Sequence, residues 1–400
     1  MNKIRVIAFA THPIQYQVPI WRSLASSPDL EFLVCFGSDF SCRAHREKDF
    51  NTEVRWNVPL LDGYKYIVLD DDPLIQGTDR YFTINGKGVS RLISEFRPDV
   101  AIVTAYSPFY WVRVIFGLIL AGCPIIYRGE ASDVALERTR FKAIIRSLIL
   151  RALYSRFRRI LAIGQRAREH YLAHGVGIDR LGWAPYCVDT AHFEQKVKVR
   201  SESRRCLREK FGIKCDAFVY IFSGKLIDKK NPLLIVLALA MRSDVENCNI
   251  AVIFVGDGPL MSELKLRTVG IKEVQVVFAG FVNQAEIGAY YAAADCLILP
   301  SRFGETWGLV VNEALQFGVP CLVSNKVGCG PDLIQSGRTG YIFESGRHDS
   351  LLECMLKIEN LMFSQRRSII ENCLLVSELY SAGVAAAGLR DAVIKIGRGK

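Results

Sequence analysis

The chain has 400 residues, of which 50% are apolar and 23% charged, and it carries a formal net charge of +10. This length exceeds what one hydrophobic core usually fills, and the composition is ordinary for a globular protein, so we expect two domains. The positive charge does not indicate nucleic-acid binding, because no recognised nucleic-acid motif is present. The 12 cysteines are scattered without a Cys-x-x-Cys pair, and Met1–Val6 shows no secretory signal, which favours a reduced, cytoplasmic chain.

Short apolar runs alternate with helical patterns through the first half of the chain. Such alternation predicts an α/β fold with a parallel sheet and argues against all-α and all-β folds. The expected strands are Ile4–Ala10, Glu31–Phe36, Tyr66–Leu69, Val100–Thr104, Ile125–Tyr127 and Ile160–Ile163. The run Phe109–Ala121 is apolar but too short to span a membrane and is interrupted by Arg113, so we expect a buried helix there.

The segment Arg138–Arg159 is the most basic part of the chain, with eight Lys or Arg residues and no acid. Residues 1–200 contain 28 Lys+Arg against 20 Asp+Glu, so most of the net positive charge lies in the first half. Within the basic segment, apolar residues recur at helical spacing: Phe141, Ile144, Ile145, Leu148 and Ile149. The pattern has two interpretations, a helix on an anionic membrane surface or a domain helix with its stripe in the core. A mixed interpretation is a core helix whose outer cations face membrane phosphates.

His170 and His174 stand one helical turn apart, a spacing that can hold a metal ion. No acidic motif accompanies them, so we predict no metal site. A polar stretch near residues 187–210 marks a domain boundary. The expected division is residues 1–198, residues 199–380 and a C-terminal helix at 381–400 that crosses back to the first domain.

Glycine turns follow several predicted strands in the second half. The strand Phe218–Ser223 leads into Gly224 and three lysines, including Lys225 and Lys230, before an apolar helix, and this arrangement suits a diphosphate. The strand Ile250–Val255 leads into Gly256-Asp-Gly258, which lacks the third glycine of the dinucleotide fingerprint. No Walker lysine motif occurs.

The most informative stretch carries two glutamates, Glu305 and Glu313, across a glycine turn and the start of an apolar helix. The run Asp295–Pro300 before it predicts a buried strand, and backbone N–H groups gather where such a strand meets a helix. Glu313 would then accept hydrogen bonds from hydroxyl groups of a bound ligand. The alternative is a solvated helix that carries two acids.

These segments, in this order, resemble the nucleotide-binding half of retaining glycosyltransferases of family 4, which have the GT-B fold. The resemblance covers about residues 218–343, with Val327–Asp332 and Gly337–Gly340 as further matches. It implies two Rossmann-like doubly wound domains that face a central cleft. Lys225 stands where many family members carry arginine, so it keeps the charge but loses the bidentate fork.

The resemblance implies a hexosyltransferase that moves a sugar from a nucleotide-diphosphate sugar to a hydroxyl group, with retention and without metal or cofactor. Glu305 would contact the transferred sugar, Glu313 the ribose, and the segment after Gly280 the base. The implied catalytic residues are Lys225, Lys230, Glu305 and Glu130. The implied donor site comprises Gly224, Gly256, Gly280, Phe281, Val282, Thr306, Trp307, Gly308, Leu309 and Glu313.

The acceptor side is predicted in the first domain. His12 or Gln15, in the loop after the first strand, would bind the acceptor, or His12 is satisfied by backbone nearby. Polar loops within residues 37–65 are a further acceptor region. Glu130 follows another strand and either orients an acceptor hydroxyl or pairs with Arg128.

The resemblance and the charge together suggest polysaccharide or lipid-linked glycan assembly at the inner face of the plasma membrane. A lipid-linked acceptor with its own diphosphate would account for the basic first half. Two alternatives stay open: another GT-B enzyme, such as an epimerase or phosphorylase, and a catalytically silent subunit that binds nucleotide sugars.

Overall fold

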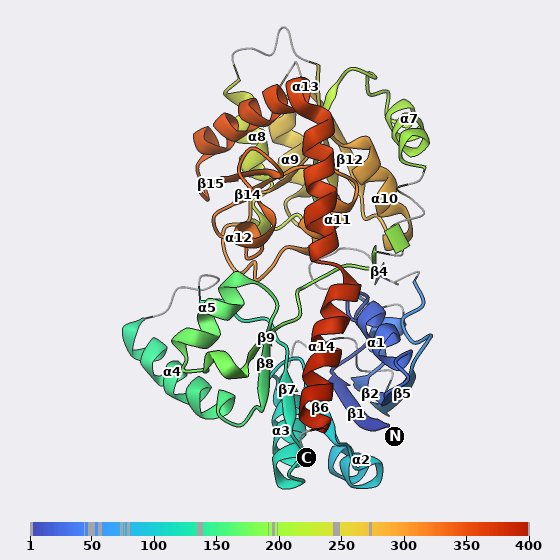
Figure 1. The fold of residues 1–400 in the computed structure, drawn as a ribbon. Helices are drawn as coiled ribbons and strands as arrows, with labels where there is room; N and C mark the ends of the chain where they lie inside the picture. Colours follow the sequence, from blue (N-terminus) through green and yellow to red (C-terminus); the bar gives the residue numbers. More distant parts are fainter. Residues whose placement is uncertain are drawn as a thin grey trace.

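The computed structural model shows two domains, one above the other, each built on a twisted parallel sheet (Figure 1). The two sheets have seven and six strands, which confirms the predicted α/β architecture of two Rossmann-like domains. The structure describes residues 3–43, 45–46, 53–54, 58–72, 75, 77, 81–133, 139–190, 192–193, 197, 199–242, 249–271 and 274–398. Arg138, residue 198 of the proposed domain boundary, and parts of the 37–65 region lie outside the described residues.

The sheet of domain 1 has the strand order β5-β2-β1-β6-β7-β8-β9, and every neighbouring pair is parallel. Its strands are β1 (Ile4–Ala10), β2 (Leu30–Ser38), β5 (Lys65–Asp70), β6 (Val100–Val103), β7 (Ile125–Tyr127), β8 (Arg159–Ala162) and β9 (Leu181–Trp183). The six predicted strands are confirmed. The strand β9 was not predicted, because Leu-Gly-Trp is short and not fully buried. Two short strands, β3 (His45–Arg46) and β4 (Glu53–Val54), form a separate antiparallel pair.

Alternate residues of β1 face opposite sides of the sheet, and both sides are buried. Ile7 and Phe9 share a core with α2 (Val89–Phe96), α3 (Phe109–Leu120), α4 (Arg140–Tyr154) and α5 (Gln165–Ala173). Val6 and Ala8 share the opposite core with α1 (Val18–Ala25) and α14 (Ala382–Gly397). The sheet therefore has helices on both faces.

One expectation for domain 1 is wrong in the described residues, and one of the open interpretations is excluded. The helix α3 is only half-buried, since Val112, Phe116 and Leu120 are exposed. The apolar stripe of α4 also faces outward, while Leu150 and Tyr154 are buried. The interpretation of α4 as a helix with its stripe in the core is thereby excluded. No described helix has the length and apolar character needed to cross a membrane.

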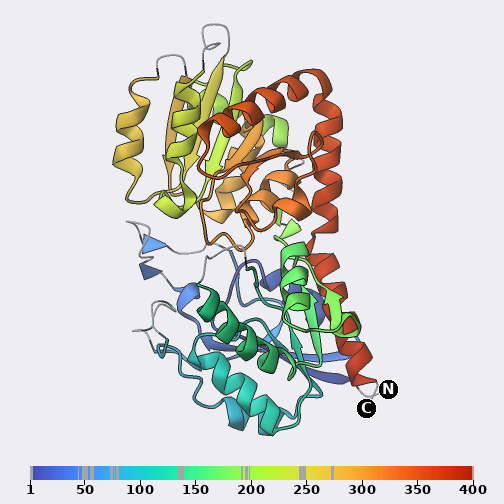
Figure 2. The same ribbon diagram turned by 90° about the vertical axis from the view of Figure 1, so that its left-hand side faces the viewer.

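The sheet of domain 2 has the order β12-β11-β10-β13-β14-β15. Its strands are β10 (Phe218–Ser223), β11 (Ile250–Val255), β12 (Val274–Gly280), β13 (Cys296–Leu299), β14 (Cys321–Ser324) and β15 (Gly340–Phe343). Its helices are α7 (Arg200–Lys210), α8 (Leu233–Ala240), α9 (Met261–Thr268), α10 (Gln284–Ala293), α11 (Leu309–Gln316), α12 (Gly330–Leu333) and α13 (His348–Leu379). The helices lie on both faces of the sheet (Figure 2).

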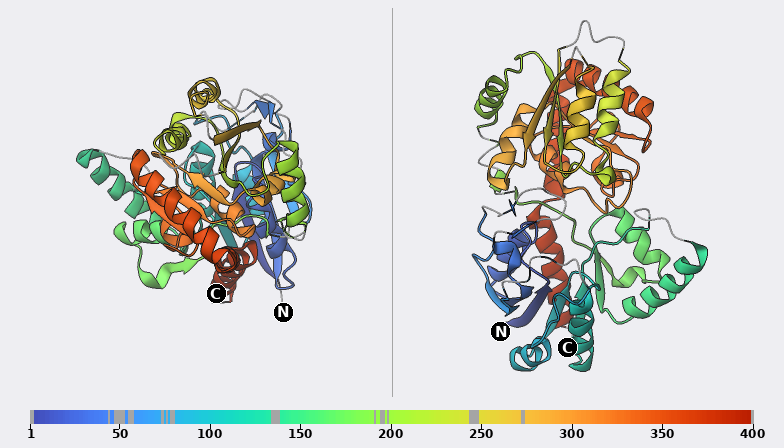
Figure 3. Two further views of the ribbon diagram at one scale, coloured as in Figure 1. Left: turned by 90° about the horizontal axis from the view of Figure 1, so that it is seen from above. Right: turned by 180° about the vertical axis from the view of Figure 1, so that it is seen from behind.

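The chain returns to domain 1 at its end. After α13 ends at Leu379, α14 runs down beside the first sheet, and the two termini lie close together (Figures 1 and 3). Arg390 of α14 donates hydrogen bonds to Asp29 at 2.6 Å and to Ser27 at 3.0 Å. The last helix thus joins the two domains non-covalently as well as through the chain.

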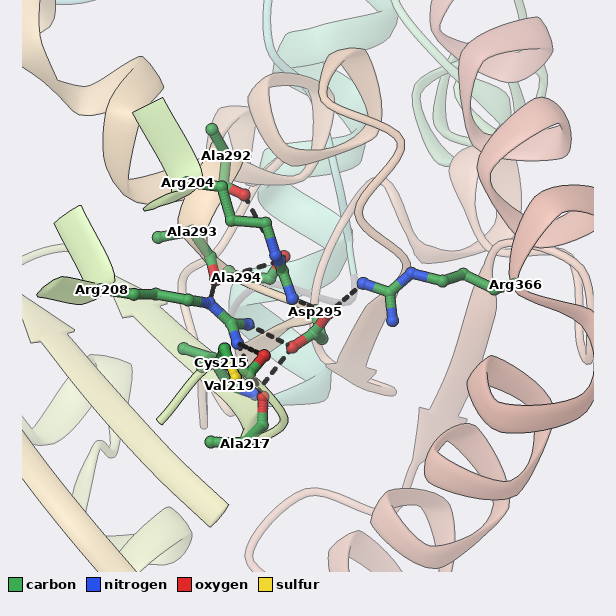
Figure 4. A network of polar contacts seen from close by, with 10 residues as sticks. All are labelled: Arg204, Arg208, Cys215, Ala217, Val219, Ala292, Ala293, Ala294, Asp295 and Arg366. Carbon is green, nitrogen blue, oxygen red and sulfur yellow. Dashed lines mark hydrogen bonds and ion pairs between the residues drawn. The ribbon is translucent and has the colours of Figure 1, made fainter. Parts of the chain in front are cut away.

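A buried ion cluster lies at the amino ends of the central strands β10 and β13 of domain 2, and Figure 4 shows its residues. The Asp295 side chain, 1% exposed, lies before β13 and pairs with Arg204 at 2.8 Å, Arg208 at 2.7 Å and Arg366. It also accepts the N–H of Val219 at 2.9 Å. The cluster joins α7, α13 and the start of the two central strands, β10 and β13, whose other ends form the candidate site.

Candidate functional site

The strand order of domain 2 reverses between the parallel strands β10 and β13, and ligands of open α/β sheets bind at such a point. The loop after β10 carries Lys230, and the loop after β13 carries Glu305. Their side chains form an ion pair, and the hydroxyl of Ser301 donates to the same Glu305 oxygen at 3.0 Å. The two side chains are only 17% and 11% exposed. The fold therefore brings together two residues that are 75 positions apart.

Glycine permits the close approach of these loops. A Cβ at Gly256 would lie 1.9 Å from the carbonyl oxygen of Gly224, and its φ of +131° favours glycine as well. A Cβ at Gly328 would lie 1.9 Å from the carbonyl oxygen of Thr306. Both glycines hold backbone segments in contact where side chains would separate them.

Glu313 lies in α11 and is 3% exposed. Its carboxylate accepts hydrogen bonds from Tyr291 at 2.7 Å, Gln284 at 3.0 Å and Tyr16 at 3.2 Å. Burial and the neighbouring carboxylate raise the pKa of both Tyr16 and Tyr291 well above 10, so both hydroxyls stay protonated and donate. Because Glu305 and Glu313 are both buried, the alternative of a solvated helix with two acids is excluded.

The first turn of α11 begins at Leu309, directly after Gly308, whose φ of +104° breaks the preceding extended chain. A helix N-terminus presents N–H groups and a positive dipole end, which favour anionic oxygens. The carboxyl ends of the strands also carry other predicted donor residues. These are Gly224 and Lys225 after β10, and Phe281 and Val282 after β12. The structure therefore places the predicted donor residues at one edge, while their binding roles stay predictions.

Glu130 lies on the domain 1 side and reaches across to domain 2. One carboxylate oxygen accepts from the Thr306 hydroxyl at 2.5 Å and the other from the Tyr186 hydroxyl at 2.5 Å. Arg128 is buried and donates instead to the carbonyl oxygens of Ala184 at 3.0 Å and Pro185 at 2.6 Å. The alternative in which Arg128 pairs with Glu130 is therefore not the observed arrangement.

The predicted donor residue Trp307 is buried between the domains. Its indole N–H donates to Asn312 at 2.7 Å, and its ring stacks on Tyr186 with centroids 5.9 Å apart. A Cβ at Gly164 of domain 1 would lie 2.2 Å from this ring. Trp307 thus contacts domain 1 and the connecting segment, and donor binding by it stays a prediction.

The loop after β1 faces the same cleft, because the strand order of domain 1 reverses between β1 and β6. His12 lies against Thr11 at 3.0 Å and the Phe40 ring at 4.5 Å, and Gln15 contacts Gln284 at 3.5 Å. A cavity of about 430 Å³ opens between the domains here. Its lining includes Gln15, Tyr16, Arg22, Asp189, His192 and Gln284.

His170 and His174 have an acidic neighbour that their sequence spacing did not reveal. Asp133 accepts from His170 Nδ1 at 2.7 Å, and the ligand atoms of the three residues lie within 4.8 Å of one another. His170 Nε2 also bonds Tyr154 at 3.0 Å, and His174 Nδ1 bonds the carbonyl oxygen of His170 at 2.8 Å. Burial lowers the pKa of His170 despite the opposing effect of Asp133. These hydrogen bonds join α5 to the segment before α4.

Sequence reasoning missed Tyr16, Gln284, Tyr291 and Ser301 as neighbours of the two glutamates. Tyr16 is next to Gln15 in a loop that was assigned to the acceptor, and no local pattern links it to Glu313, 297 residues away. Gln284 is the first residue of α10, and Tyr291 lies about two turns further along the same helix. A prediction that these residues meet would have required the strand order of both sheets, which brings the loop after β1 and the start of α10 to Glu313.

One family model matches the part of the chain that contains most of domain 2. Residues 203–373 match the family model described as glycosyl transferases group 1. The matched segment contains Lys225, Lys230, Glu305 and Glu313, and it coincides with most of domain 2.

Several curated proteins are similar to parts of the chain. Sulfoquinovosyl transferase SQD2 of Arabidopsis thaliana is 36% identical over 29% of this chain and 22% of its own length. A D-inositol 3-phosphate glycosyltransferase of Pseudarthrobacter chlorophenolicus is 28% identical over 60% of this chain and 58% of its own length. An Escherichia coli UDP-Gal:alpha-D-GlcNAc-diphosphoundecaprenol alpha-1,3-galactosyltransferase is 32% identical over 42% of this chain and 44% of its own length. The matches thus span between about a fifth and three fifths of these relatives, all of which are transferases by name.

Solved structures resemble the chain over nearly its whole length. A glycosyltransferase of Rickettsia africae has a TM-score of 0.71 at 14% identity, with both chains covered completely. Anabaena HepE in complex with UDP has a TM-score of 0.70 at 18% identity and covers 98% of this chain and all of its own. At such identities the likeness establishes the GT-B fold.

Proposed function

We propose that this chain is a retaining glycosyltransferase that transfers a sugar from a nucleotide-diphosphate sugar to a hydroxyl acceptor. The observation that carries the proposal is the ion pair of Lys230 and Glu305 beside buried Glu313 at the switch point of domain 2. The group 1 family match over the same residues supports it. HepE, solved in complex with UDP and with UDP-glucose, shares the fold, which makes a uridine nucleotide a reasonable first donor to test.

In the proposed reaction, negative charge grows on the departing diphosphate. Lys230 has three N–H donors and so can hold Glu305 and a phosphate oxygen together, while Lys225 and the start of α11 supply further positive potential. Glu305 would bind hydroxyls of the transferred sugar and Glu313 those of the ribose. The residues Gly280, Phe281 and Val282 would contact the base.

Retention is proposed to follow from attack on the same face that the leaving group departs from. A covalent route would need a carboxylate nucleophile below the anomeric carbon. We favour a route in which the leaving phosphate accepts the acceptor proton, with Glu130 orienting the acceptor hydroxyl. The bond to the diphosphate breaks as the new glycosidic bond forms, and closure of the domains limits hydrolysis.

The proposed acceptor is a glycan or a lipid-linked glycan, bound near the cavity beside Gln15 and Tyr16 at a cytoplasmic membrane face. The basic first half supports this choice, since 28 Lys+Arg stand against 20 Asp+Glu in residues 1–200. The name of the E. coli relative describes a diphosphoundecaprenol-linked acceptor, which is the same chemical class.

Two other functions are compatible with the fold. A UDP-N-acetylglucosamine 2-epimerase of Listeria monocytogenes, described as putative, has a TM-score of 0.62 to the chain, so an epimerase or phosphorylase is the second candidate. A silent nucleotide-sugar-binding subunit is the third. The epimerase or phosphorylase would convert the donor without a glycan acceptor. The silent subunit would bind the donor without turnover.

The test is transfer of labelled sugar from UDP, GDP and ADP sugars to hydroxyl acceptors, with and without EDTA. We expect one donor to be used, with an α-linked donor giving an α-linked product, and with a rate that EDTA changes by less than about twofold, because cationic side chains hold the diphosphate. An inverted product, or loss of activity that added Mg²⁺ or Mn²⁺ restores, would contradict the proposed mechanism.

A further inference from the structure

Domain 1 carries an exposed apolar surface on two helices, α3 and α4. On α4, Phe141 is 73% exposed, Leu148 63% and Ile144 60%, and Ile145 and Ile149 are exposed as well. At about 100° per residue, these five side chains occupy an arc of about 140° on one side of the helix. Leu150 and Tyr154, on the opposite side, are buried and fix α4 to the domain.

Cations border this stripe. Lys142 and Arg151, both exposed, fall at the two edges of the apolar arc, about 20° beyond its last members. Arg146 lies further back, where it pairs with Asp133 at 2.9 Å. An apolar strip with basic residues at its edges is the pattern of a helix that lies in the interface of an anionic bilayer.

The neighbouring helix α3 extends the surface. It follows β6 as α4 follows β7, so both helices cover the same face of the sheet, and both lie at the front of domain 1 in Figure 2. Leu120 is 72% exposed, Phe116 61% and Val112 44%, all on one side of α3. Arg113 borders this side and lies over the Phe109 ring at 5.4 Å.

A basic cavity of about 270 Å³ lies beyond the end of α4, at the start of β8, where α14 from the opposite face of the sheet also lines it. It is lined by Arg158, Arg159, Arg180 and Lys395, with Asp179 as the one acid among its lining residues. Arg180 also donates to the carbonyl oxygens of Tyr154 at 3.1 Å and Phe157 at 3.2 Å, which ties the cavity to the last turn of α4. A phosphate group of a lipid has the charge that this cavity would accept.

We propose that the outward faces of α3 and α4 form a membrane-docking surface whose occupant is the headgroup and acyl boundary of an anionic bilayer. A second copy of the chain fits less well, because a two-fold contact would place these cationic borders against each other. Membrane docking itself does not depend on the proposed function. Only its role in giving access to a lipid-linked acceptor rests on that function. α4 follows β7, whose carboxyl end faces the cleft, so docking would bring the membrane surface toward the acceptor side.

The test is sedimentation of the full chain with phosphatidylcholine vesicles that contain roughly 30% phosphatidylglycerol, and with phosphatidylcholine alone. We expect binding to the anionic vesicles that weakens with salt. The combined variant Phe141→Ser, Ile144→Ser, Leu148→Ser should lower the partition coefficient at least about tenfold, since it removes three apolar side chains. Phe363→Ser is the matched control, because Phe363 is 94% exposed but lies on α13 in domain 2.

Failure of the wild type to bind anionic vesicles would overturn the proposal, as would equal binding by the triple variant. A concentration-dependent dimer that the triple variant abolishes, without vesicle binding, would assign the surface to a second copy instead. Thermal stabilisation by the donor is measured in parallel. Vesicle binding without donor binding would support the docking surface and overturn the proposed function. Donor binding without vesicle binding would overturn the docking surface and leave the proposed function supported.

Discussion

Replacement of Asp295 with asparagine is expected to lower the free energy of unfolding by about 3 kcal/mol, measured by urea denaturation at neutral pH. The carboxylate pairs with Arg204, Arg208 and Arg366, and its own side chain is 1% exposed. Its loss leaves the Arg208 guanidinium, whose side chain is 5% exposed, without a counter-charge, which costs more than the pair itself contributes. The cluster also fixes the start of β13, so donor-site geometry should loosen with stability.

The matched control is Glu371→Gln, which breaks the exposed pair of Arg367 and Glu371 and should cost no more than about 0.5 kcal/mol.

The pH dependence of the Asp295→Asn effect separates the contribution of charge from that of packing. Burial acts to raise the pKa of Asp295, but the three arginines outweigh it, so the net pKa lies below the usual 3.8. A carboxylate with a lowered folded-state pKa stabilises the fold above the unfolded pKa, and this contribution is lost as the pH falls through the folded value. The difference between wild type and variant should therefore shrink below about pH 4, and a constant difference would contradict the electrostatic explanation.

Replacement of Lys230 with alanine is expected to reduce the turnover number by about 10²- to 10³-fold, with a smaller change in KM. The ammonium group is paired with Glu305 at the switch point, where charge on the departing diphosphate would develop. Its loss removes stabilisation that grows as the reaction proceeds, so the turnover number falls more than the affinity. Steady-state kinetics with the preferred donor measure both quantities.

Lys214→Ala serves as the control for this variant. Lys214 is exposed and bonds Asn249 at 3.1 Å just before β10, at the opposite edge of the sheet from Lys230, so its removal should leave the rate within about twofold. Lys230→Arg should restore part of the rate, because it keeps the positive charge. A Lys230→Ala enzyme that turns over at the wild-type rate would remove Lys230 from the proposed mechanism.

Strands could be predicted where an uninterrupted apolar run stands between turn signals. Phe218–Ser223 and Ile250–Val255 match β10 and β11 to the residue, and Ile4–Ala10 matches β1. The last two strands in the order of the domain 2 sheet, β14 and β15, were not predicted. Both are short, and the run Gly340–Phe343 also includes a glycine and a partly exposed pair.

The orientation of α4 shows what periodicity leaves undetermined. The spacing of Phe141, Ile144 and Leu148 defines a stripe, but either side of such a helix can face a core. Leu150, which interrupts the polar side in sequence, is the residue that anchors the helix, together with Tyr154. Similarly, the contact of Tyr16 with Glu313 depends on how two domains meet, and no local pattern encodes it.

The central claim is that domain 2 binds a nucleotide sugar at the carboxyl ends of its strands, through Glu313 and its neighbours. Thermal stabilisation by a panel of UDP, GDP and ADP sugars, measured on wild type, Glu313→Ala and the exposed control Glu353→Ala, tests it most directly. A donor at 100 times its Kd should stabilise the wild type and the control by about 2.7 kcal/mol, and it should stabilise Glu313→Ala far less. Absence of any shift in the wild type, or an equal shift in Glu313→Ala, would contradict the account.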